Sequence, residues 1–478
     1  MDMKLSRFLI NGEWRCSERK RTLFNPFNKK TVGEVYLASS EDIDAAIQAA
    51  ADAFRLTRRL PAYKRSEILL FIARGIEANR EEFSALITAE TGKPISFSRA
   101  EVERSVLTFT VASEETKRIE GGVLPLDLAA HSENRLGVVR RFPLGPVGAI
   151  TPFNFPLNLV AHKVAPAIAS GCTIVLKPSS SAPLTALFLA EVIHRSQLPQ
   201  GAFNIVPCRA DEAAQLIIDE RIKLISFTGS PPVGWAIKSK AGKKRVVLEL
   251  GGNAGVIVDR DADFDFALKR IVQGSYGNAG QSCIAVQRIY VHRDLYEAFT
   301  HRFVELTKAV VVGDPENDET VVGPMIDEDA AGKVEGWIKE AVDSGARILC
   351  GGKRDGPVLE PTILVDVNPR MKVSCQEVFA PVVTLSSFES FPEAVSLVND
   401  SDYGLQAGVF SNNFSNIFYA YQELDVGGVI INDFPTYRID HMPYGGVKDS
   451  GFGREGIKYA IEEMTELKLM AINLGSTT

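Results

Sequence analysis

Residues 147–249 contain five short apolar runs, VGAIT (147–151), TIVLK (173–177), FNIV (203–206), LISF (224–227) and VVLE (246–249). Helical patterns of apolar residues separate the later runs, at Pro183–Ser196, Glu212–Asp219 and Pro231–Lys240. Short strands that alternate with helices predict βαβ units, which make neighbouring strands parallel. Ligands bind such sheets at the carboxyl ends of the strands. We therefore predict an α/β fold and look for polar residues at those ends.

A second series of the same kind follows Gly251. Its expected strands are Ala254–Val258, Arg288–His292 and Val382–Phe388, and its expected helices are Phe264–Ser275, Tyr296–Lys308 and Asp329–Ser344. We interpret this series as a second α/β domain that shares a cleft with the first. Upstream, a strand-like segment at Phe8–Gly12 precedes two amphipathic helices, expected at Asp42–Phe54 and Ser66–Ile76.

Between the helical region and the first apolar run, residues Glu120–Arg141 contain a Gly-Gly pair and two segments of alternating polarity. This pattern is typical of a hairpin that protrudes from a compact body. Exposed strand edges readily pair with another copy of a chain. We therefore expect a homo-oligomer, either a dimer or a tetramer.

The composition indicates a folded protein with a small partner. Among 478 residues, 45% are hydrophobic and 24% are charged, with a net charge of -7 and no long basic run, so nucleic acid is not expected. The six cysteines lie far apart without a CxxC pair, which predicts a cytoplasmic protein with no metal site. The uncharged stretch Phe142–His162 has the length of a membrane span, but its prolines and asparagines favour a buried loop system.

One cysteine has a setting that suits chemistry. Cys283 ends the small-residue segment Asn278-Ala279-Gly280-Gln281-Ser282-Cys283, between an expected helix and an expected strand. A Gly-containing turn can present a thiolate to a cleft with backbone N–H groups nearby. An inert buried cysteine is the alternative, and we assign that role to Cys172, Cys208, Cys350 and Cys375.

Two further polar residues follow expected strands. Glu249 ends an apolar strand and precedes Gly251-Gly252, where the backbone can turn sharply beside a ligand. Burial there would raise the pKa of the carboxyl group, as a general base requires, although a capping or salt-bridged glutamate fits equally well. Asn154 lies between Pro152 and Pro156, so its amide is held firmly enough to donate to an oxyanion or to satisfy its own turn.

The segment Phe227-Thr228-Gly229-Ser230-Pro231 joins a strand to a helix. Ser230 can cap a helix whose first residue is Pro231. The amino terminus of a helix offers N–H groups and a positive dipole to a phosphate, so Gly229 and Ser230 are candidates for a phosphate site.

Together these motifs resemble the aldehyde dehydrogenase superfamily over essentially the whole chain. The similarity rests on Pro152-Phe153-Asn154-Phe155-Pro156, Glu249-Leu250-Gly251-Gly252, Gly280-Gln281-Ser282-Cys283, Glu377-Val378-Phe379-Ala380-Pro381 and Pro443-Tyr444-Gly445-Gly446. The resemblance implies that Cys283 is the nucleophile, that Asn154 and the Cys283 N–H stabilise the oxyanion, and that Glu249 activates water. The expected reaction is oxidation of an aldehyde to a carboxylic acid through a thiohemiacetal and a thioester, an EC 1.2.1 type activity.

The resemblance also implies a cofactor, NAD or NADP. Glu377 matches the residue that holds the nicotinamide ribose, Phe379 the ring beside it, and Lys177 the lysine at the adenosine ribose. The complete set of expected cofactor residues is Thr151, Phe153, Lys177, Ser179, Ser180, Gly229, Ser230, Glu377 and Phe379. Many NAD-preferring relatives carry Glu where this chain has Ser180, so NADP becomes plausible.

The substrate is expected to be a short polar aldehyde. The segments at 283–288 and 435–443 are similar to those of lactaldehyde, succinate-semialdehyde and non-phosphorylating glyceraldehyde-3-phosphate dehydrogenases. Arg104 lies in the region where several of these relatives place an arginine facing the substrate tunnel, and we expect Arg438 near its mouth. Either arginine could bind an anionic tail, or form an ordinary salt bridge. Ser282 occupies the position where phosphate-binding relatives carry Arg. This difference argues against a phosphorylated substrate.

The resemblance suggests three parts. Residues 1–120 and 141–250 form a Rossmann-like cofactor domain, residues 251–440 a catalytic domain, and residues 121–140 and 455–478 a small β oligomerisation arm. Two other classes of protein remain open, namely a thiol hydrolase that pairs Cys283 with a histidine and a binding protein that has lost catalysis. Within the superfamily, members that pass the thioester to CoA typically lack the base found here at Glu249.

Overall fold

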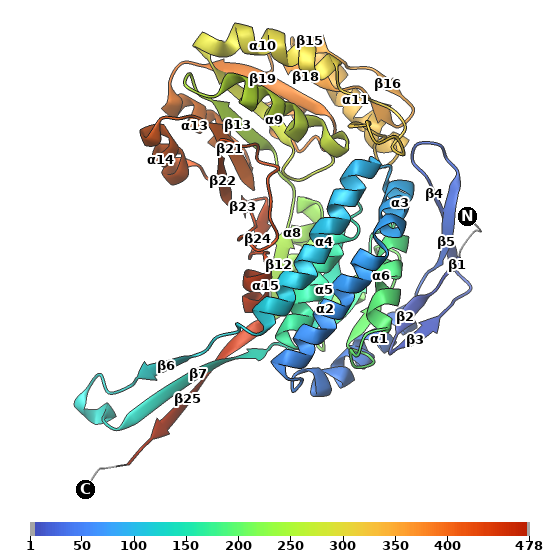
Figure 1. Cartoon of the computed structure of the whole chain (residues 1–478), viewed down its shortest axis with the longest axis vertical. Helices are drawn as coiled ribbons and strands as arrows, with labels where there is room; N and C mark the ends of the chain where they lie inside the picture. The colour runs from blue at the N-terminus through green and yellow to red at the C-terminus, as the bar shows by residue number, and fades with distance from the viewer. Residues whose placement is uncertain (1–4, 476–478) are drawn as a thin grey trace.

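The computed structural model describes residues 5–475 and shows two α/β lobes with a long β arm (Figure 1). The first lobe contains an eight-stranded sheet with the order β24-β12-β11-β8-β9-β10-β2-β3. Its strands are β2 (Phe8–Ile10), β3 (Glu13–Arg15), β8 (Pro146–Ile150), β9 (Thr173–Lys177), β10 (Phe203–Ile205), β11 (Leu224–Thr228), β12 (Arg245–Glu249) and β24 (Gly451–Phe452). The five central strands are parallel, which confirms the predicted βαβ series.

The order of these strands reverses at β8. From β8 the chain continues to β9 and β10 on one side, whereas β11 and β12 lie on the other side. The carboxyl ends of β8 and β11 therefore flank a topological switch point, where open α/β sheets bind ligands. Helices pack on both faces of this sheet, namely α1 (Ser40–Thr57), α2 (Ala62–Ala78), α3 (Arg80–Thr91), α4 (Ile95–Thr116), α5 (Asn158–Ser170), α6 (Leu184–His194), α7 (Ala214–Ile218), α8 (Pro231–Lys240) and α15 (Ile457–Glu463).

The second lobe contains a seven-stranded sheet with the order β15-β18-β19-β14-β13-β21-β22. The strands are β13 (Ala254–Val258), β14 (Val286–His292), β15 (Arg347–Cys350), β18 (Thr362–Val365), β19 (Val382–Phe388), β21 (Gln406–Phe410) and β22 (Gly428–Ile431). All neighbours are parallel except β15 and β18. The accompanying helices are α9 (Phe264–Tyr276), α10 (Arg293–Lys308), α11 (Glu328–Asp343), α12 (Lys372–Cys375), α13 (Phe391–Asn399) and α14 (Phe414–Glu423).

Smaller sheets complete the fold. Strand β1 (Leu5–Ser6) pairs with β5 (Thr31–Tyr36), which also pairs with β4 (Lys20–Phe24). Two short pairs are formed by β16 (Arg354–Asp355) with β17 (Val358–Leu359), and by β20 (Tyr403–Gly404) with β23 (Val447–Lys448).

The stretch 142–162 is only partly the loop system that its prolines suggest. Helix α5 begins at Asn158, inside this stretch, and is buried along its whole length. Its first N–H groups, those of Leu157 and Asn158, donate to the Glu101 carboxylate at 2.9 and 3.1 Å. A side chain from α4 thus caps the helix, and a local pattern cannot show such a long-range cap. Among residues 5–475, no helix is long and apolar enough to cross a membrane.

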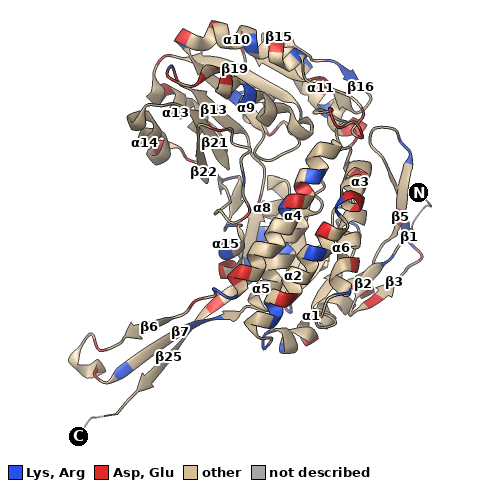
Figure 2. Cartoon of the chain, in the orientation of Figure 1, with Lys and Arg blue, Asp and Glu red and all other residues tan. Residues whose placement is uncertain are grey.

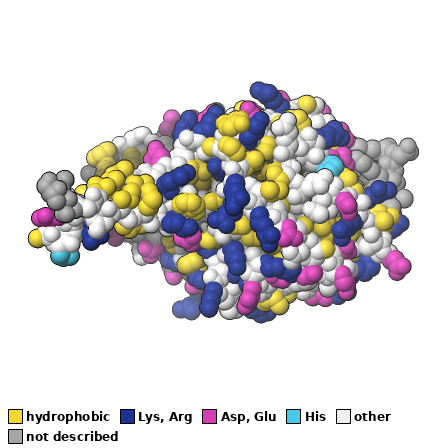
Figure 3. Space-filling model, turned by 90° about the horizontal axis from the view of Figure 1, so that it is seen from below, with side chains coloured by type: hydrophobic (Ala, Val, Ile, Leu, Met, Phe, Trp, Pro, Cys, Tyr) yellow, Lys and Arg dark blue, Asp and Glu magenta, His cyan; other side chains and the backbone are white. Residues whose placement is uncertain are grey.

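The arm is a three-stranded antiparallel sheet with β7 (Arg135–Pro143) between β6 (Gly122–Pro125) and β25 (Thr465–Asn473). The predicted arm segment 455–478 differs from the structure at its start, because α15 packs against α5 on the body. The strands of the arm carry charged residues, among them Arg135, Arg140 and Lys468. Figure 2 shows charged segments along the arm, and hydrophobic side chains gather on it (Figure 3). The exposed apolar residues there are Val123, Leu124, Leu128, Leu467, Leu469, Met470 and Leu474.

Candidate active site

A cavity of about 360 Å³ is lined by residues from both lobes. Asn154 and Glu249 reach it from the carboxyl ends of β8 and β12 in the first lobe, and Cys283 reaches it from the loop before β14 in the second. The same cavity is lined by Phe153, Gly229, Ser230, Glu377 and Phe379 among the expected cofactor residues, and by both candidate substrate residues, Arg104 and Arg438. The structure thus brings the three expected catalytic side chains to one site.

The loop that carries Cys283 has an unusual backbone. Asn278, Ala279 and Gly280 all have left-handed conformations, with φ of 55°, 53° and 67°. This conformation costs an L-residue such as Ala279 about 1–2 kcal/mol, so the surrounding packing must hold the loop in place. A side chain on Gly280 would collide with the backbone carbonyl of Ala380. The sharp turn exposes the Cys283 side chain to the cavity.

The Gly-Gly pair after Glu249 has a steric purpose. A Cβ atom on Gly252 would collide with the backbone carbonyl oxygen of Cys283. On Gly251 it would lie 2.6 Å from a carboxylate oxygen of Glu377. These two glycines therefore allow the end of β12, the Cys283 loop and the Glu377 segment to meet around the cavity.

The Cys283 side chain is partly buried and lies beside a tyrosine. Burial raises the pKa of Cys283 to about 12, and the Tyr444 hydroxyl, 3.1 Å from Sγ, acts in the opposite direction. The guanidinium carbon of Arg438 lies 3.6 Å from the centre of the Tyr444 ring. The motif Pro443-Tyr444-Gly445-Gly446 indicates the family, but the sequence carries no signal for the contact of Tyr444 with Cys283, 161 positions apart.

Donors to an oxyanion lie beside the thiol. The Asn154 amide donates one hydrogen to the Gln281 carbonyl at 3.1 Å, which fixes the side chain and leaves its second hydrogen free. Asn154 Oδ1 is buried without a hydrogen-bond partner. Within residues 5–475, the Cys283 N–H also has no hydrogen-bond acceptor. Two N–H groups are therefore available near the sulfur.

Glu249 has the environment of a general base. Its side chain is buried, and neither carboxylate oxygen has a hydrogen-bond partner among the described residues. Burial, together with the negative charge of Glu455, raises the pKa of Glu249 well above its usual value. A carboxylate in such a site is a better proton acceptor than one in water.

A buried cluster of charged residues, Glu455, Lys163 and Arg438, lies close to Glu249. The sequence alone did not predict it. Glu455 accepts hydrogen bonds from Lys163 Nζ and from Arg438 Nη2, both at 3.1 Å. Burial would raise the pKa of Glu455, but the cation of Lys163 and the charges near it lower that pKa to about 2. Lys163 lies on α5 and Glu455 lies near the end of the chain, so only the folded structure shows that they pair.

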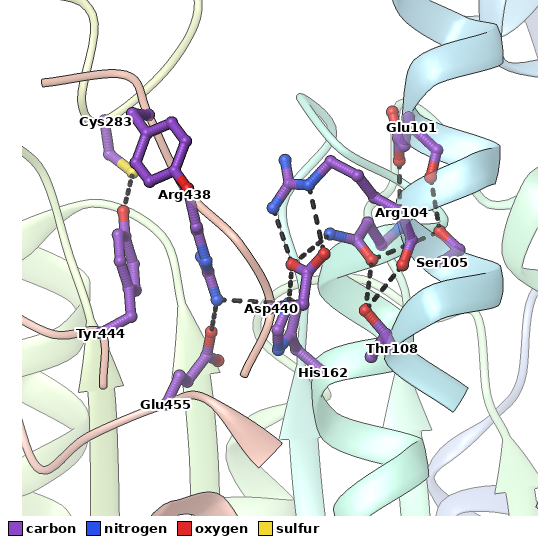
Figure 4. Close-up of polar contacts among 12 residues, drawn as sticks. Glu101, Arg104, Ser105, Thr108, His162, Cys283, Arg438, Asp440, Tyr444 and Glu455 are labelled. Atoms are coloured by element: carbon purple, nitrogen blue, oxygen red, sulfur yellow. Dashed lines mark hydrogen bonds and ion pairs between the residues drawn. The ribbon is translucent and has the colours of Figure 1, made fainter. Parts of the chain in front are cut away.

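Both arginines hold partners in the structure (Figure 4). Arg104 binds Asp440 through Nη2 at 2.8 Å and Nε at 3.3 Å, and Asp440 also contacts His162 Nε2 at 2.7 Å. The prediction that Arg438 lies near the mouth is wrong, because its side chain is only 7% exposed and bonds to Glu455. Its Nε atom is buried without a partner. Arg104, whose side chain is 29% exposed, is the more accessible of the two.

The switch point carries unsatisfied polar atoms. The hydroxyl groups of Thr151, after β8, and of Thr228, at the end of β11, are buried without hydrogen-bond partners. Glu377 accepts the Gly252 N–H at 2.9 Å, and burial raises the pKa of Glu377 to about 7. Phe379 has φ of 54° and packs edge-on against Phe153, with 6.1 Å between ring centres. The surface formed by these residues suits an extended ligand with hydroxyl groups and a flat ring.

The other expected cofactor residues lie further along the sheet. Lys177 Nζ donates to the Pro178 carbonyl at 2.9 Å and to Ser180 Oγ at 3.2 Å. Ser179 and Ser180 line a separate small hollow together with Arg21 and Arg209. Ser230 precedes α8, but the first two helical residues are Pro231 and Pro232. Prolines have no N–H, so this helix offers fewer phosphate donors than we expected.

Comparisons with known proteins agree with this geometry. Residues 14–470 match the model of the aldehyde dehydrogenase family. The chain is 46% identical over 466 residues to a 3-sulfolactaldehyde dehydrogenase of Priestia aryabhattai, which covers 97% of each chain. Therefore the chain belongs to the aldehyde dehydrogenase family.

Two solved structures are also close. Aldehyde dehydrogenase 21 of Physcomitrella patens, in complex with the reaction product succinate, superposes with a TM-score of 0.98 at 43% identity and covers 100% of both chains. The glyceraldehyde-3-phosphate dehydrogenase GapN of Methanocaldococcus jannaschii, complexed with NADP, gives a TM-score of 0.91 at 39% identity and covers 96% of this chain and 100% of that one. These matches confirm the predicted α/β fold.

Proposed function

We propose that this protein oxidises a short aldehyde with an anionic tail to the carboxylic acid, with NAD or NADP as the acceptor. The observation that carries the proposal is the single cavity lined by Cys283, Asn154, Glu249, Arg104 and Arg438. It combines a nucleophile, an oxyanion donor, a base and two cations. Lactaldehyde itself and other short polar aldehydes are weaker substrates in this proposal, because they lack the charge that the arginines bind.

The first half of the reaction forms a bond to sulfur. The Cys283 thiolate attacks the carbonyl carbon, and the electron pair of the C=O double bond moves to the oxygen. Asn154 Nδ2 and the Cys283 N–H donate to this oxyanion. When bound, the oxidised nicotinamide accepts a hydride from the substrate carbon. As the oxyanion regenerates the C=O bond, the substrate is left as a thioester on Cys283.

The second half releases the acid. Glu249 takes a proton from a water molecule, whose oxygen attacks the thioester carbon. The C–S bond breaks and the electron pair returns to Cys283 as a thiolate. The unpaired, buried carboxylate of Glu249 suits this step, and it favours hydrolysis over transfer to CoA.

The chain's own groups fit a dinucleotide at the switch point. In the proposal, Glu377 accepts from the nicotinamide ribose, and Phe379 and Phe153 flank the ring. Thr151, Gly229 and Ser230 face the central part of the dinucleotide. Lys177, Ser179 and Ser180 hold its adenosine ribose. The buried Thr151 hydroxyl, which has no hydrogen-bond partner among the described residues, supports this assignment. The first lobe is then the cofactor domain and the second lobe the domain that supplies the nucleophile.

The anionic tail is inferred from Arg104, because Arg438 lines the cavity but is already paired with Glu455. Asp440 holds Arg104 by two bonds, which leaves Arg104 Nη1 free to bind a ligand in the cavity. The relatives support a charged tail as well, since one is described as acting on 3-sulfolactaldehyde and another binds succinate. A sulfonate and a carboxylate share the anionic oxygens that a guanidinium recognises.

A matched pair of aldehydes tests the proposal. Succinic semialdehyde and butanal have four carbons each, and only the first carries a carboxylate. We expect kcat/KM to favour succinic semialdehyde in the wild type, and Arg104→Gln to lower that preference by about 10-fold or more. Arg99→Gln is the control, because Arg99 lies on the same helix but pairs with Glu81 and Asp318 on the surface. Equal turnover of both aldehydes by the wild type would exclude the anionic tail.

We also propose a cytoplasmic homo-oligomer, a dimer or a tetramer, that pairs through the arm. All six cysteines are unpaired, which suits a reducing compartment. The competing thiol hydrolase receives no support, since no histidine in the described chain lines the Cys283 cavity. A requirement for oxidised nicotinamide cofactor distinguishes the two enzymes.

A further inference from the structure

We infer that Tyr444 is a further catalytic residue, whose hydroxyl donates a hydrogen bond to the Cys283 thiolate and makes it available at neutral pH. This inference rests on the proposed function, because it assigns Tyr444 a role toward the proposed nucleophile. Figure 4 shows the Tyr444 hydroxyl directed at the Cys283 sulfur. The two atoms are 3.1 Å apart, which is within hydrogen-bond range for sulfur.

The setting of the thiol makes such a donor necessary. Burial raises the pKa of Cys283 to about 12, and the carboxylates of Glu377 and Glu249 add to that effect. A thiol in this state would be almost fully protonated at pH 7 and a poor nucleophile. The hydrogen bond from Tyr444 is the largest of the influences that oppose burial.

Tyr444 is held so that its hydroxyl has few other uses. The residue is 3% exposed, and within the described chain its hydroxyl forms a hydrogen bond only with the Cys283 sulfur. Its backbone N–H donates to the Glu455 carbonyl at 3.0 Å, and the Glu455 N–H donates back to the Tyr444 carbonyl at 2.6 Å. The backbone is therefore clamped, and the ring projects toward the cavity.

Arg438 strengthens the donor. Its guanidinium carbon lies 3.6 Å from the centre of the Tyr444 ring. A cation over an aromatic face is attracted to the ring electrons and stabilises negative charge that moves toward the ring. Burial raises the pKa of the Tyr444 hydroxyl well above its usual value and Arg438 opposes that effect, so the hydroxyl keeps its proton and can donate it in a hydrogen bond. A charged acceptor such as a thiolate gains most from such a bond. Arg438 is itself fixed by its bond to Glu455.

Direct alkylation of the thiol tests this role without any turnover. The probe is iodoacetamide, applied between pH 6 and 10. Mass spectrometry follows labelling of the peptide that contains Cys283, so the other cysteines do not contribute to the measured rate. In Tyr444→Phe, which keeps the ring, we expect labelling of Cys283 at pH 7 to slow by about 10–100-fold, because a hydrogen bond to a charged group is lost. The apparent pKa of the thiol should rise accordingly.

The matched control is Tyr296→Phe, which removes a half-buried hydroxyl that bonds to the Leu385 carbonyl outside the cavity. It should leave labelling of Cys283 unchanged. If Tyr444→Phe does not fold, Tyr444→His serves, because its ring N–H can donate and should keep labelling near the wild-type rate. An unchanged or faster reaction at Cys283 in Tyr444→Phe would overturn the inference, as would a slow reaction in a folded Tyr444→His variant.

Failure of this inference is separable from failure of the proposed function. If Cys283→Ala kept its dehydrogenase turnover, the thiol would not be the nucleophile and the proposed function would fall. If turnover depends on Cys283 while the labelling rates of wild type and Tyr444→Phe agree, only the role of Tyr444 falls.

Discussion

At the scale of single residues, the cavity combines an acid that should lose a proton with a base that should gain one. In the proposed mechanism, Cys283 must ionise in a partly buried site, whereas Glu249 must remain able to accept a proton in the same site. Burial raises the pKa of both groups. The raised pKa helps Glu249 as a base and hinders Cys283 as a nucleophile, so the hydrogen-bond donors around the sulfur have the decisive role.

Replacement of the nucleophile is the most direct prediction. Cys283→Ala should abolish aldehyde oxidation and leave cofactor binding, measured by fluorescence titration, largely intact. Cys172→Ala is the control, because Cys172 is buried in the hydrophobic core of the first lobe and does not line the cavity. Substantial turnover in Cys283→Ala, or an equal loss in Cys172→Ala, would contradict the choice of thiol.

Replacement of the base should separate the two halves of the reaction. In Glu249→Ala, thioester formation should persist and give up to about one reduced cofactor per site, while steady-state turnover slows by about 10²–10⁴-fold. A rapid absorbance burst at 340 nm followed by a slow phase is the expected trace. Steady-state turnover close to that of the wild type would require another base.

The pH dependence of hydrolysis follows from the same carboxyl group. Its pKa is raised by burial and by the charge of Glu455, so at acidic pH Glu249 is protonated and cannot accept a proton from water. Hydrolysis should therefore increase as the pH rises through this pKa and level off above it. Single-turnover release of the acid measures the step. A pH-independent rate in the wild type would contradict the role of Glu249.

We propose that Ser180 sets the cofactor preference. Its hydroxyl accepts from Lys177 at 3.2 Å, beside Arg21 and Arg209. A 2′-phosphate would gain from these cations, whereas a carboxylate at position 180 would repel it. We expect NADP to be used at least as well as NAD, and Ser180→Glu to lower kcat/KM for NADP much more than for NAD. The ratio should be measured at fixed ionic strength, and an unchanged ratio would exclude Ser180 as the determinant.

At the scale of elements, sequence reasoning was most successful where structure is local. The strands at 173–177 and 254–258 and the helix at 231–240 have the predicted bounds. Both strands are buried at every residue and appear in the sequence as short apolar runs, which are local signals. The start of α5 was missed because its cap is Glu101, 56 residues upstream. Likewise, the contact of Arg438 with Glu455 joins two loops whose approach depends on the whole lobe.

The contact between β12 and the Cys283 loop gives a prediction at this scale. Gly252→Ala places a methyl group against the Cys283 carbonyl, so the loop must shift away from Glu249 and Asn154. Misplacement of a nucleophile by about 1 Å costs about 10²-fold in rate. We expect at least that loss of kcat. Gly332→Ala, on an open face of α11, should have no effect on kcat. Normal turnover in Gly252→Ala would show that the loop tolerates the added atom.

At the scale of the whole molecule, the arm is the part of the chain that we propose pairs with another copy. Among residues 5–475, no strand pairs with the outer edge of β6 or of β25. Apolar side chains such as Leu467 and Leu469 are 60% and 52% exposed. Exposed apolar strands of this kind bind another chain or aggregate.

Introducing charged residues on the arm should therefore make the oligomer dissociate into smaller species. Leu467→Asp with Leu469→Asp should lower the mass measured by light scattering after size-exclusion chromatography. Leu56→Asp, at an equally exposed apolar position on α1, is the control and should keep the wild-type mass. An unchanged mass in the double variant would show that the arm is not the interface.

The return of the chain from the second lobe to β24 limits how the protein can be divided. Strand β24 pairs with β12 and forms one edge of the eight-stranded sheet, although some 200 residues separate the two strands. A fragment that stops after Gly252 would expose the edge of β12 and would lack Tyr444, Arg438 and Glu455. The two lobes are therefore not separable modules. Cutting the gene at the boundary between them should yield halves that recover activity only when both are present together.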